Sequence, residues 1–181
     1  TREFMQLQGL GIDCSGFVIH VYNEWTKMKL NQRLPHYLSR KPIKGLGQKV
    51  LYSFKYAQLT SALMLTSEHN TNKVELKDIQ PGDLLRLRGA KQGDHILLIS
   101  KVEYDEYNTP ITFTYTHAAE HYGESSGVKE GNVVITDIEL ELKDQDWQEA
   151  DESGRNWTYE GLLNEYEDNG IRRFKFADKL K

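Results

Sequence analysis

The spacing of apolar residues changes near residue 74, and this change restricts the chain to a small group of folds. Before that point, apolar residues recur every three or four positions over about 14–29 and 48–68, which is the spacing of amphipathic helices. After it, short runs of alternating or branched apolar residues, separated by Gly and Pro, predict strands. Helices followed by strands predict an α+β fold in which N-terminal helices pack on an antiparallel β-sheet.

Turn residues divide the second part of the chain into separate strands. The expected strands span 74–89, interrupted by a turn at Pro81-Gly82, and then 95–103, 111–119, 132–142 and 170–177. The acidic, polar segment 143–156 is expected to be an exposed loop, and Arg172 and Arg173 are interpreted as ordinary strand residues. At 181 residues, the chain is long enough for one domain with a real core, so we expect residues 1–181 to form a single domain.

Charges of both signs are mixed along the whole chain. It has 23 Lys and Arg against 27 Asp and Glu, a formal net charge of −4. Binding to nucleic acid requires clustered basic residues, so we expect no nucleic-acid partner. No apolar run reaches the roughly 18 residues of a spanning helix, so we expect no membrane span. The chain begins at Thr1 without an initiator Met, so the lack of a visible leader says little about location.

Cys14 is the only cysteine, and it stands at the start of the first predicted helix, directly after the natural N-cap Asp13. Unpaired N–H groups and the positive end of the helix dipole favour a thiolate there. Lowering a thiol pKa by two units requires about 2.7 kcal/mol, of which a helix end supplies about 1 kcal/mol. Asp13 acts in the opposite direction. A reactive Cys14 therefore needs a histidine cation, and without one it is an inert, small apolar residue.

Two of the six histidines are well placed to provide that partner. His95 opens one expected strand and His117 closes the next, so a hairpin centred near residue 106 places them opposite each other. Their side chains would share one face of the sheet with Leu97, Ile99, Phe113 and Tyr115. The pattern predicts a catalytic triad of Cys14, His95 and His117.

The predicted triad assigns one role to each residue. Cys14 attacks an amide or ester carbonyl, His95 holds the thiolate and then protonates the leaving group, and His117 orients His95. The backbone N–H of Cys14 is a candidate oxyanion donor. A zinc site made of Cys14, His117 and His121 is the alternative, but strand positions four apart are separated by about 13 Å, so we expect no metal.

Several short motifs resemble those of a known family. "DCSGF", "LPHYLSR", "PGDLL", His95 before a branched apolar strand, "THAA" and "GIRRF" resemble, in this order, the NlpC family of papain-like cysteine peptidases. The resemblance implies a papain-like α+β fold, no cofactor, and cleavage of bacterial cell-wall stem peptides, often next to D-glutamate. It implies catalytic roles for Cys14 and His95, with His117 as the third polar residue. It also implies that Asp13 and Ser15 bind the amino end of the substrate, although the two residues serve equally well as a helix cap and a first-turn residue.

The chain departs from the family pattern in two places. The family has a tyrosine about twelve residues before the cysteine, where this chain has Arg2, and no tyrosine precedes Tyr22. The segment at about 36–75 is longer than the family requires and is expected to be a helical insertion. Three functions remain open: a cell-wall endopeptidase, a cysteine amidase or acyltransferase of the same fold on a non-wall substrate, and a non-catalytic module that binds wall peptides. The first implies an extracytoplasmic, wall-associated location, and a cytoplasmic one stays open.

Overall fold

The computed structural model describes residues 13–39, 60–89, 93–119, 127–150, 153–163 and 168–181. The helices are α2 (Cys14–Leu30), α4 (Ala62–Leu65) and α5 (Trp157–Leu163), with short 3-10 turns at Leu34–His36, Leu76–Asp78, Leu142–Asp144 and Ala177–Leu180. The strands are β1 (Thr71–Lys73), β2 (Leu84–Gly89), β3 (Gly93–Tyr104), β4 (Pro110–Ala119), β5 (Gly127–Val134), β6 (Asp146–Trp147) and β7 (Gly170–Phe174).

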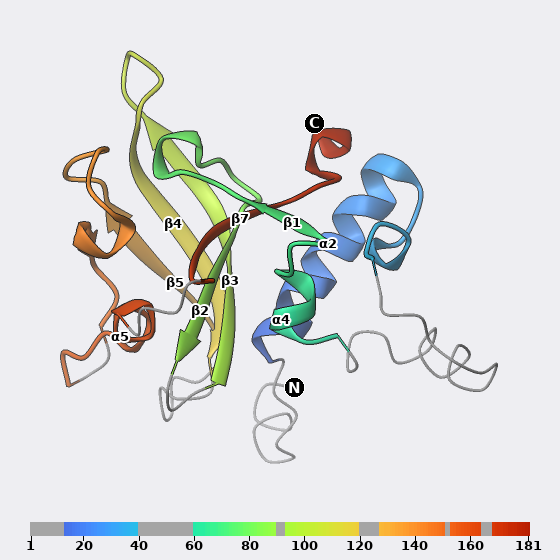
Figure 1. The fold of residues 1–181 in the computed structure, drawn as a ribbon, viewed down its shortest axis with the longest axis horizontal. Coiled ribbons are helices and arrows are strands. Elements are labelled where there is room, and N and C mark those ends of the chain that lie inside the picture. Colours follow the sequence, from blue (N-terminus) through green and yellow to red (C-terminus); the bar gives the residue numbers. More distant parts are fainter. Residues whose placement is uncertain (1–12, 40–59, 90–92, 120–126, 151–152, 164–167) are drawn as a thin grey trace.

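The strands of the described residues form one sheet with helices on both of its faces. The sheet has seven strands in the order β1-β7-β2-β3-β4-β5-β6. Its neighbouring strands run antiparallel. Figure 1 shows α2 and α4 on one side of the sheet and α5 on the other. Helices combined with an antiparallel sheet agree with the predicted α+β class.

Alternating side chains of the central strands pack into two separate hydrophobic cores, one on each face of the sheet. Leu84 of β2 and Leu98 of β3 pack under α2 against Ile19 and Tyr22. Their immediate neighbours, such as Leu97, point to the other face and join the core beneath α5. Successive strand residues point to opposite faces, so a sheet covered on both faces needs apolar residues at consecutive positions. This explains the unbroken apolar run of β3.

Helix α2 begins and ends where the sequence predicts. Asp13 is its N-cap, and the Asp13 side chain accepts a hydrogen bond from the N–H of Gly16. The helix ends after Leu30 at Asn31, which adopts the left-handed conformation with φ of 53°. The prediction of a helix from about Cys14 to Lys29, capped by Asp13, is therefore confirmed.

Two of the predicted elements are wrong in their described parts. The predicted helix over 48–68 does not continue through Ser61, which is extended and caps the separate short helix α4; residues 48–59 lie outside the described residues. The predicted strand at 74–79 is a turn instead, and β1 lies just before it. Leu76 and Ile79 are both buried there. A spacing of three suits one turn of 3-10 helix better than a strand.

The segment after β5 also differs from the prediction. The predicted strand at 132–142 ends at Val134, because the side chain of Gln145 ties the following residues into a loop. Gln145 accepts from the backbone N–H of Thr136 and donates to the carbonyl oxygens of Asp137, Leu140 and Glu141. The predicted exposed loop at 143–156 is likewise wrong in part, since it contains β6 and a buried glutamate.

The β3–β4 hairpin has a register two residues away from the predicted one. Leu98 faces Thr116, and irregularities at Ser100 and near Tyr104 interrupt the ladder. Continuing this register places His117 opposite Leu97 instead of His95. The shift is an even number of residues, so both histidines still belong to the predicted face. They lie diagonally, not directly opposed.

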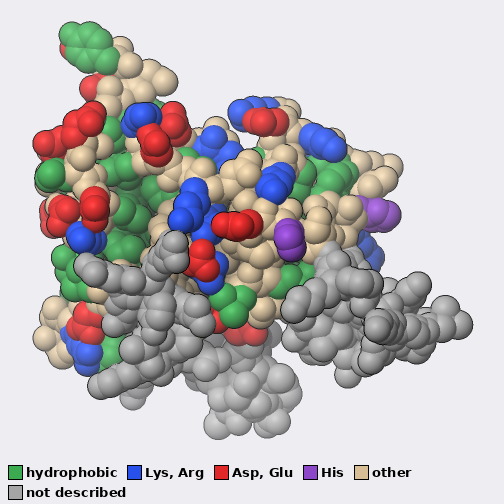
Figure 2. Space-filling model, viewed as in Figure 1, with side chains coloured by type: hydrophobic (Ala, Val, Ile, Leu, Met, Phe, Trp, Pro, Cys, Tyr) green, Lys and Arg blue, Asp and Glu red, His purple; other side chains and the backbone are tan. Residues whose placement is uncertain are grey.

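Figure 2 shows basic and acidic side chains intermixed over one face of the molecule. None of the helices in the described ranges has the length and apolar character that crossing a bilayer would require.

Candidate active site

The thiol of Cys14 lies where the first helix meets the start of β3. In Figure 1, the start of α2 and the start of β3 lie at the same, lower end of the fold. The sulfur is 4.0 Å from the carbonyl oxygen of Asp94 and receives a hydrogen bond from the backbone N–H of Ile96. These two residues flank His95. The fold thus brings Cys14 against the strand segment that carries the predicted base.

The surroundings of Cys14 do not ionise it on their own. Burial raises the pKa of the Cys14 thiol above its ordinary value, and the charge of Asp13 raises it further. The N–H groups of Ile96, Ser15 and Cys14 itself oppose this rise without cancelling it. Ionisation therefore requires a proton acceptor that becomes a cation beside the sulfur, as the sequence argument expects.

His95 and His117 are in direct contact. Nε2 of His95 lies 2.8 Å from Nδ1 of His117, and the two rings meet edge to face at 72°. His117 is 1% exposed, so water cannot replace its partners. The diagonal register still lets the two imidazole rings reach each other.

A glutamate that the sequence reasoning missed completes this cluster. Nε2 of His117 lies 3.0 Å from Oε1 of Glu149, and Glu149 is 7% exposed. The hydroxyl groups of Tyr115 and Thr158 both donate to Oε2 of Glu149, each at 2.6 Å. These partners come from β4 and α5. Both oxygens of the buried carboxylate therefore have hydrogen-bond donors.

These contacts fix the direction of the hydrogen bonds. Burial raises the pKa of Glu149, but His117, Thr158 and Tyr115 together outweigh it and lower that pKa to about 2. An ionised carboxylate only accepts, so Nε2 of His117 donates to it. A neutral His117 must then accept at Nδ1 from the Nε2–H of His95. A neutral His95 consequently has its lone pair on Nδ1, the form required of a general base.

The two predicted substrate-binding residues contact each other. The hydroxyl of Ser15 donates to Oδ1 of Asp13 at 3.0 Å, and the N–H of Gly16 donates to the same oxygen. Ser15 is buried and Asp13 is exposed. Capping explains both contacts, and Asp13 keeps an exposed carboxylate beside Cys14. Their role in substrate binding stays a prediction.

The described residues offer no cluster of three or more His, Cys, Asp or Glu side chains arranged to hold a metal ion. His121, the third ligand of the zinc alternative, lies outside the described residues.

Comparison with known families identifies the group to which this site belongs. The family model of the NlpC/P60 family matches residues 4–104, more than half of the chain. The chain belongs to the NlpC/P60 family. Domains of this family are generally cysteine peptidases or amidases, and their fold is papain-like. Searches of curated proteins and of solved structures found no match.

The NlpC/P60 match covers only part of the described cluster. Cys14 and His95 fall within residues 4–104, whereas His117 and Glu149 follow them. The assignment of the last two to the site therefore depends on geometry. The sequence offered one indirect signal for Glu149: Trp147, a large aromatic in a polar segment, packs against the core beneath α5.

Proposed function

We propose that this protein is a cysteine hydrolase that cleaves an amide bond in bacterial cell-wall stem peptides. The single observation that carries the proposal is the hydrogen-bonded line from His95 through His117 to Glu149. His95 lies between Asp94 and Ile96, whose backbone groups contact the Cys14 sulfur. A buried line of this kind fixes the orientation and tautomer of a base. An inert cysteine would need none of it.

The proposed reaction begins with proton transfer. Nδ1 of His95 takes the proton of the Cys14 thiol, and the resulting imidazolium offsets the burial that disfavours the thiolate. The sulfur attacks the amide carbonyl, and the backbone N–H of Cys14 stabilises the oxyanion. His95 then gives its proton to the leaving amine, and the C–N bond breaks to leave a thioester.

The second half of the reaction regenerates the thiol. His95, neutral again, takes a proton from water, and the hydroxide attacks the thioester carbonyl. The C–S bond breaks, the acid leaves, and the sulfur regains its proton from His95. In both halves, Glu149 and His117 keep His95 in one orientation and stabilise its positive charge.

The choice of substrate depends on the family resemblance and on Asp13. An exposed carboxylate next to the nucleophile suits the ammonium group at the amino end of a short peptide, and buried Ser15 holds that carboxylate in place. A wall substrate also implies an extracytoplasmic location. A same-fold amidase or acyltransferase is the second candidate, because Arg2 stands where the family has the tyrosine that assists in oxyanion and substrate binding.

Digestion of purified wall fragments, followed by mass analysis of the products, tests the proposal. We expect one defined amide to be cut, and Cys14→Ala to lower the rate by about three orders of magnitude or more. Lys101→Gln, on the exposed part of β3, is the control and should keep full activity. Intact fragments together with rapid alkylation of Cys14 would favour the amidase or acyltransferase, and unchanged fragment binding by Cys14→Ala without cleavage by either protein would favour a binding module.

A further inference from the structure

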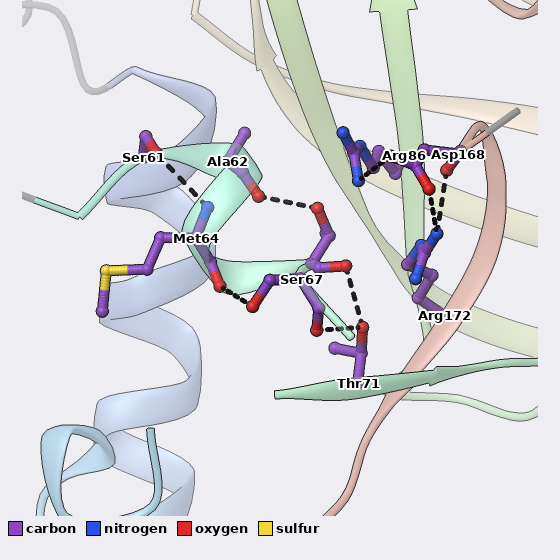
Figure 3. Close-up of polar contacts among 9 residues, drawn as sticks. Ser61, Ala62, Met64, Ser67, Thr71, Arg86, Asp168 and Arg172 are labelled. Atoms are coloured by element: carbon purple, nitrogen blue, oxygen red, sulfur yellow. Dashed lines mark hydrogen bonds and ion pairs between the residues drawn. The ribbon is translucent and has the colours of Figure 1, made fainter. Parts of the chain in front are cut away.

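Two arginine side chains lie buried next to each other on the face of the sheet that carries α2 and α4. Arg86 belongs to β2 and Arg172 to the neighbouring β7. Their side chains are 5% and 1% exposed. In the ladder, Arg86 pairs with Gly170, two residues from Arg172, so both arginines point to the same face. Figure 3 shows both guanidinium groups beside Asp168.

One carboxylate serves both guanidinium groups. Arg86 Nη1 lies 3.4 Å from Oδ2 of Asp168, and Arg172 Nη2 lies 3.2 Å from its Oδ1. Burial, followed by repulsion from Arg86, lowers the pKa of Arg172, while Asp168 and the exposed Glu68 oppose this change. A guanidinium nevertheless stays ionised at any ordinary pH. The cluster therefore holds two positive charges against one contacting negative charge among the described residues.

Several of the arginine donors have no acceptor among the residues that the structure describes. Nε of Arg86, and Nε and Nη1 of Arg172, are buried and make no hydrogen bond in the described part of the chain. Buried charges with unpaired donors are unfavourable unless a counter-ion satisfies them. The guanidinium fork matches the oxygens of a carboxylate or phosphate. Asp168, 44% exposed, marks the side from which such a group can approach.

We propose that Arg86 and Arg172 form a binding site for a small oxyanion, either a carboxylate or a phosphate group. The bound group supplies the second negative charge and accepts the hydrogen bonds that Asp168 leaves unmade. This proposal does not depend on the chemistry of Cys14. The site is nevertheless near it, because Arg86 pairs with Ile96, whose N–H contacts the Cys14 sulfur.

Thermal unfolding in added anion tests the site. Sodium phosphate and sodium succinate are compared with sodium chloride at equal ionic strength, and binding of each anion is measured by calorimetry. We expect phosphate or succinate to raise the Tm with the logarithm of the anion concentration, by about 5 °C at about a hundred times the Kd that calorimetry gives. Arg86→Met and Arg172→Met should abolish both the rise and the binding. Arg155→Met, which removes an exposed arginine paired with Glu160, should keep them.

A third variant should strengthen anion binding instead of abolishing it. Among the described residues, Asp168 is the only carboxylate in contact with the two arginines, so we expect Asp168→Asn to tighten anion binding roughly tenfold. A merely structural ion-pair cluster would instead lose stability without gaining affinity. The absence of any anion-dependent rise in the wild type, or an equal rise in Arg172→Met, would overturn the proposal.

The same measurements distinguish the source of the anion. A response to phosphate alone indicates a phosphate group, and a response to succinate alone indicates a carboxylate. If the anion belongs to the substrate, phosphate raises the KM for wall fragments; if a free anion binds, KM stays constant. The Tm and calorimetric results stand even if no wall fragment is cleaved, so the failure of one proposal is distinguishable from the failure of the other.

Discussion

The sheet carries a buried charged cluster on each face, and the two clusters are built differently. Under α5, Glu149 receives donors on both carboxylate oxygens, from His117, Tyr115 and Thr158. On the opposite face, Arg86 and Arg172 share the carboxylate of Asp168, and three of their nitrogen atoms have no hydrogen-bond partner among the described residues. The first cluster satisfies the hydrogen bonds of its carboxylate and can orient a neighbour. The second lacks an acceptor and can recruit one.

The largest expected effect comes from the residue at the open end of the first cluster. His95→Ala removes the proposed base, so kcat/KM for wall-fragment cleavage should fall about a thousandfold. His36→Ala, in the short turn after α2, should leave the rate unchanged and serves as the control. Equal rates for both variants would mean that His95 is not the base and that the Glu149 cluster orients no catalytic residue.

Acid should weaken the Glu149 cluster. Folding lowers the pKa of Glu149 from 4.5 to about 2, so its stabilising contribution is complete above about pH 4.5 and is lost as pH falls toward 2. The difference corresponds to about 3 kcal/mol of unfolding free energy. Urea unfolding across this range measures it. Glu149→Gln should remove this part of the pH dependence, and an unchanged profile would contradict the assignment.

Glu149→Gln should also slow catalysis without weakening substrate binding. The amide keeps the shape of the carboxylate but not its charge, so a positive His95 is less well stabilised. We expect kcat to fall about thirtyfold at constant KM, and the acid limb of the pH–rate profile to move to lower pH. Glu139→Gln, in an exposed loop, is the matched control. A change in KM alone would place Glu149 outside the reaction.

The smallest expected effect is a difference in unfolding free energy between one variant of each cluster. Thr158→Val removes one donor from the Glu149 cluster and should destabilise the protein by about 1.5 kcal/mol. Arg86→Met removes an incompletely paired buried charge and, without added anion, should stay within about 1 kcal/mol of wild type or gain stability. Urea unfolding of both variants in chloride buffer gives the comparison. Equal losses would mean that the arginine cluster is as well satisfied as the other.

Local sequence patterns predicted the parts of the fold that depend on local interactions. Helix α2 follows from its apolar spacing and from Asp13, β3 follows from its run of branched apolar residues, and β4 follows from alternation. The face shared by His95 and His117 survived a wrong register because strand side chains repeat every two residues. The register of the β3–β4 hairpin depends on irregularities such as the one at Ser100, and no pattern in the sequence predicted them.

The missed features depend on contacts between distant segments. Glu149 lies in a stretch whose composition suggests a solvated loop, and its burial requires β4 and α5 to meet around it. Arg172 was interpreted as an ordinary strand residue, since alternation cannot show that Arg86 lies next to it. Charge pairing across 80 or more residues is a property of the assembled sheet.

The hydrogen-bonded line from His95 through His117 to Glu149 has a consequence for the nascent chain. A ribosome that has released residues up to the end of β4 has already supplied the thiol and both imidazoles, but not the acidic anchor. That anchor becomes buried only when α5, which follows it in the chain, docks against it. Under the proposed mechanism, hydrolytic competence therefore waits until α5 has been synthesised, and chains that end before α5 spare the peptides around them.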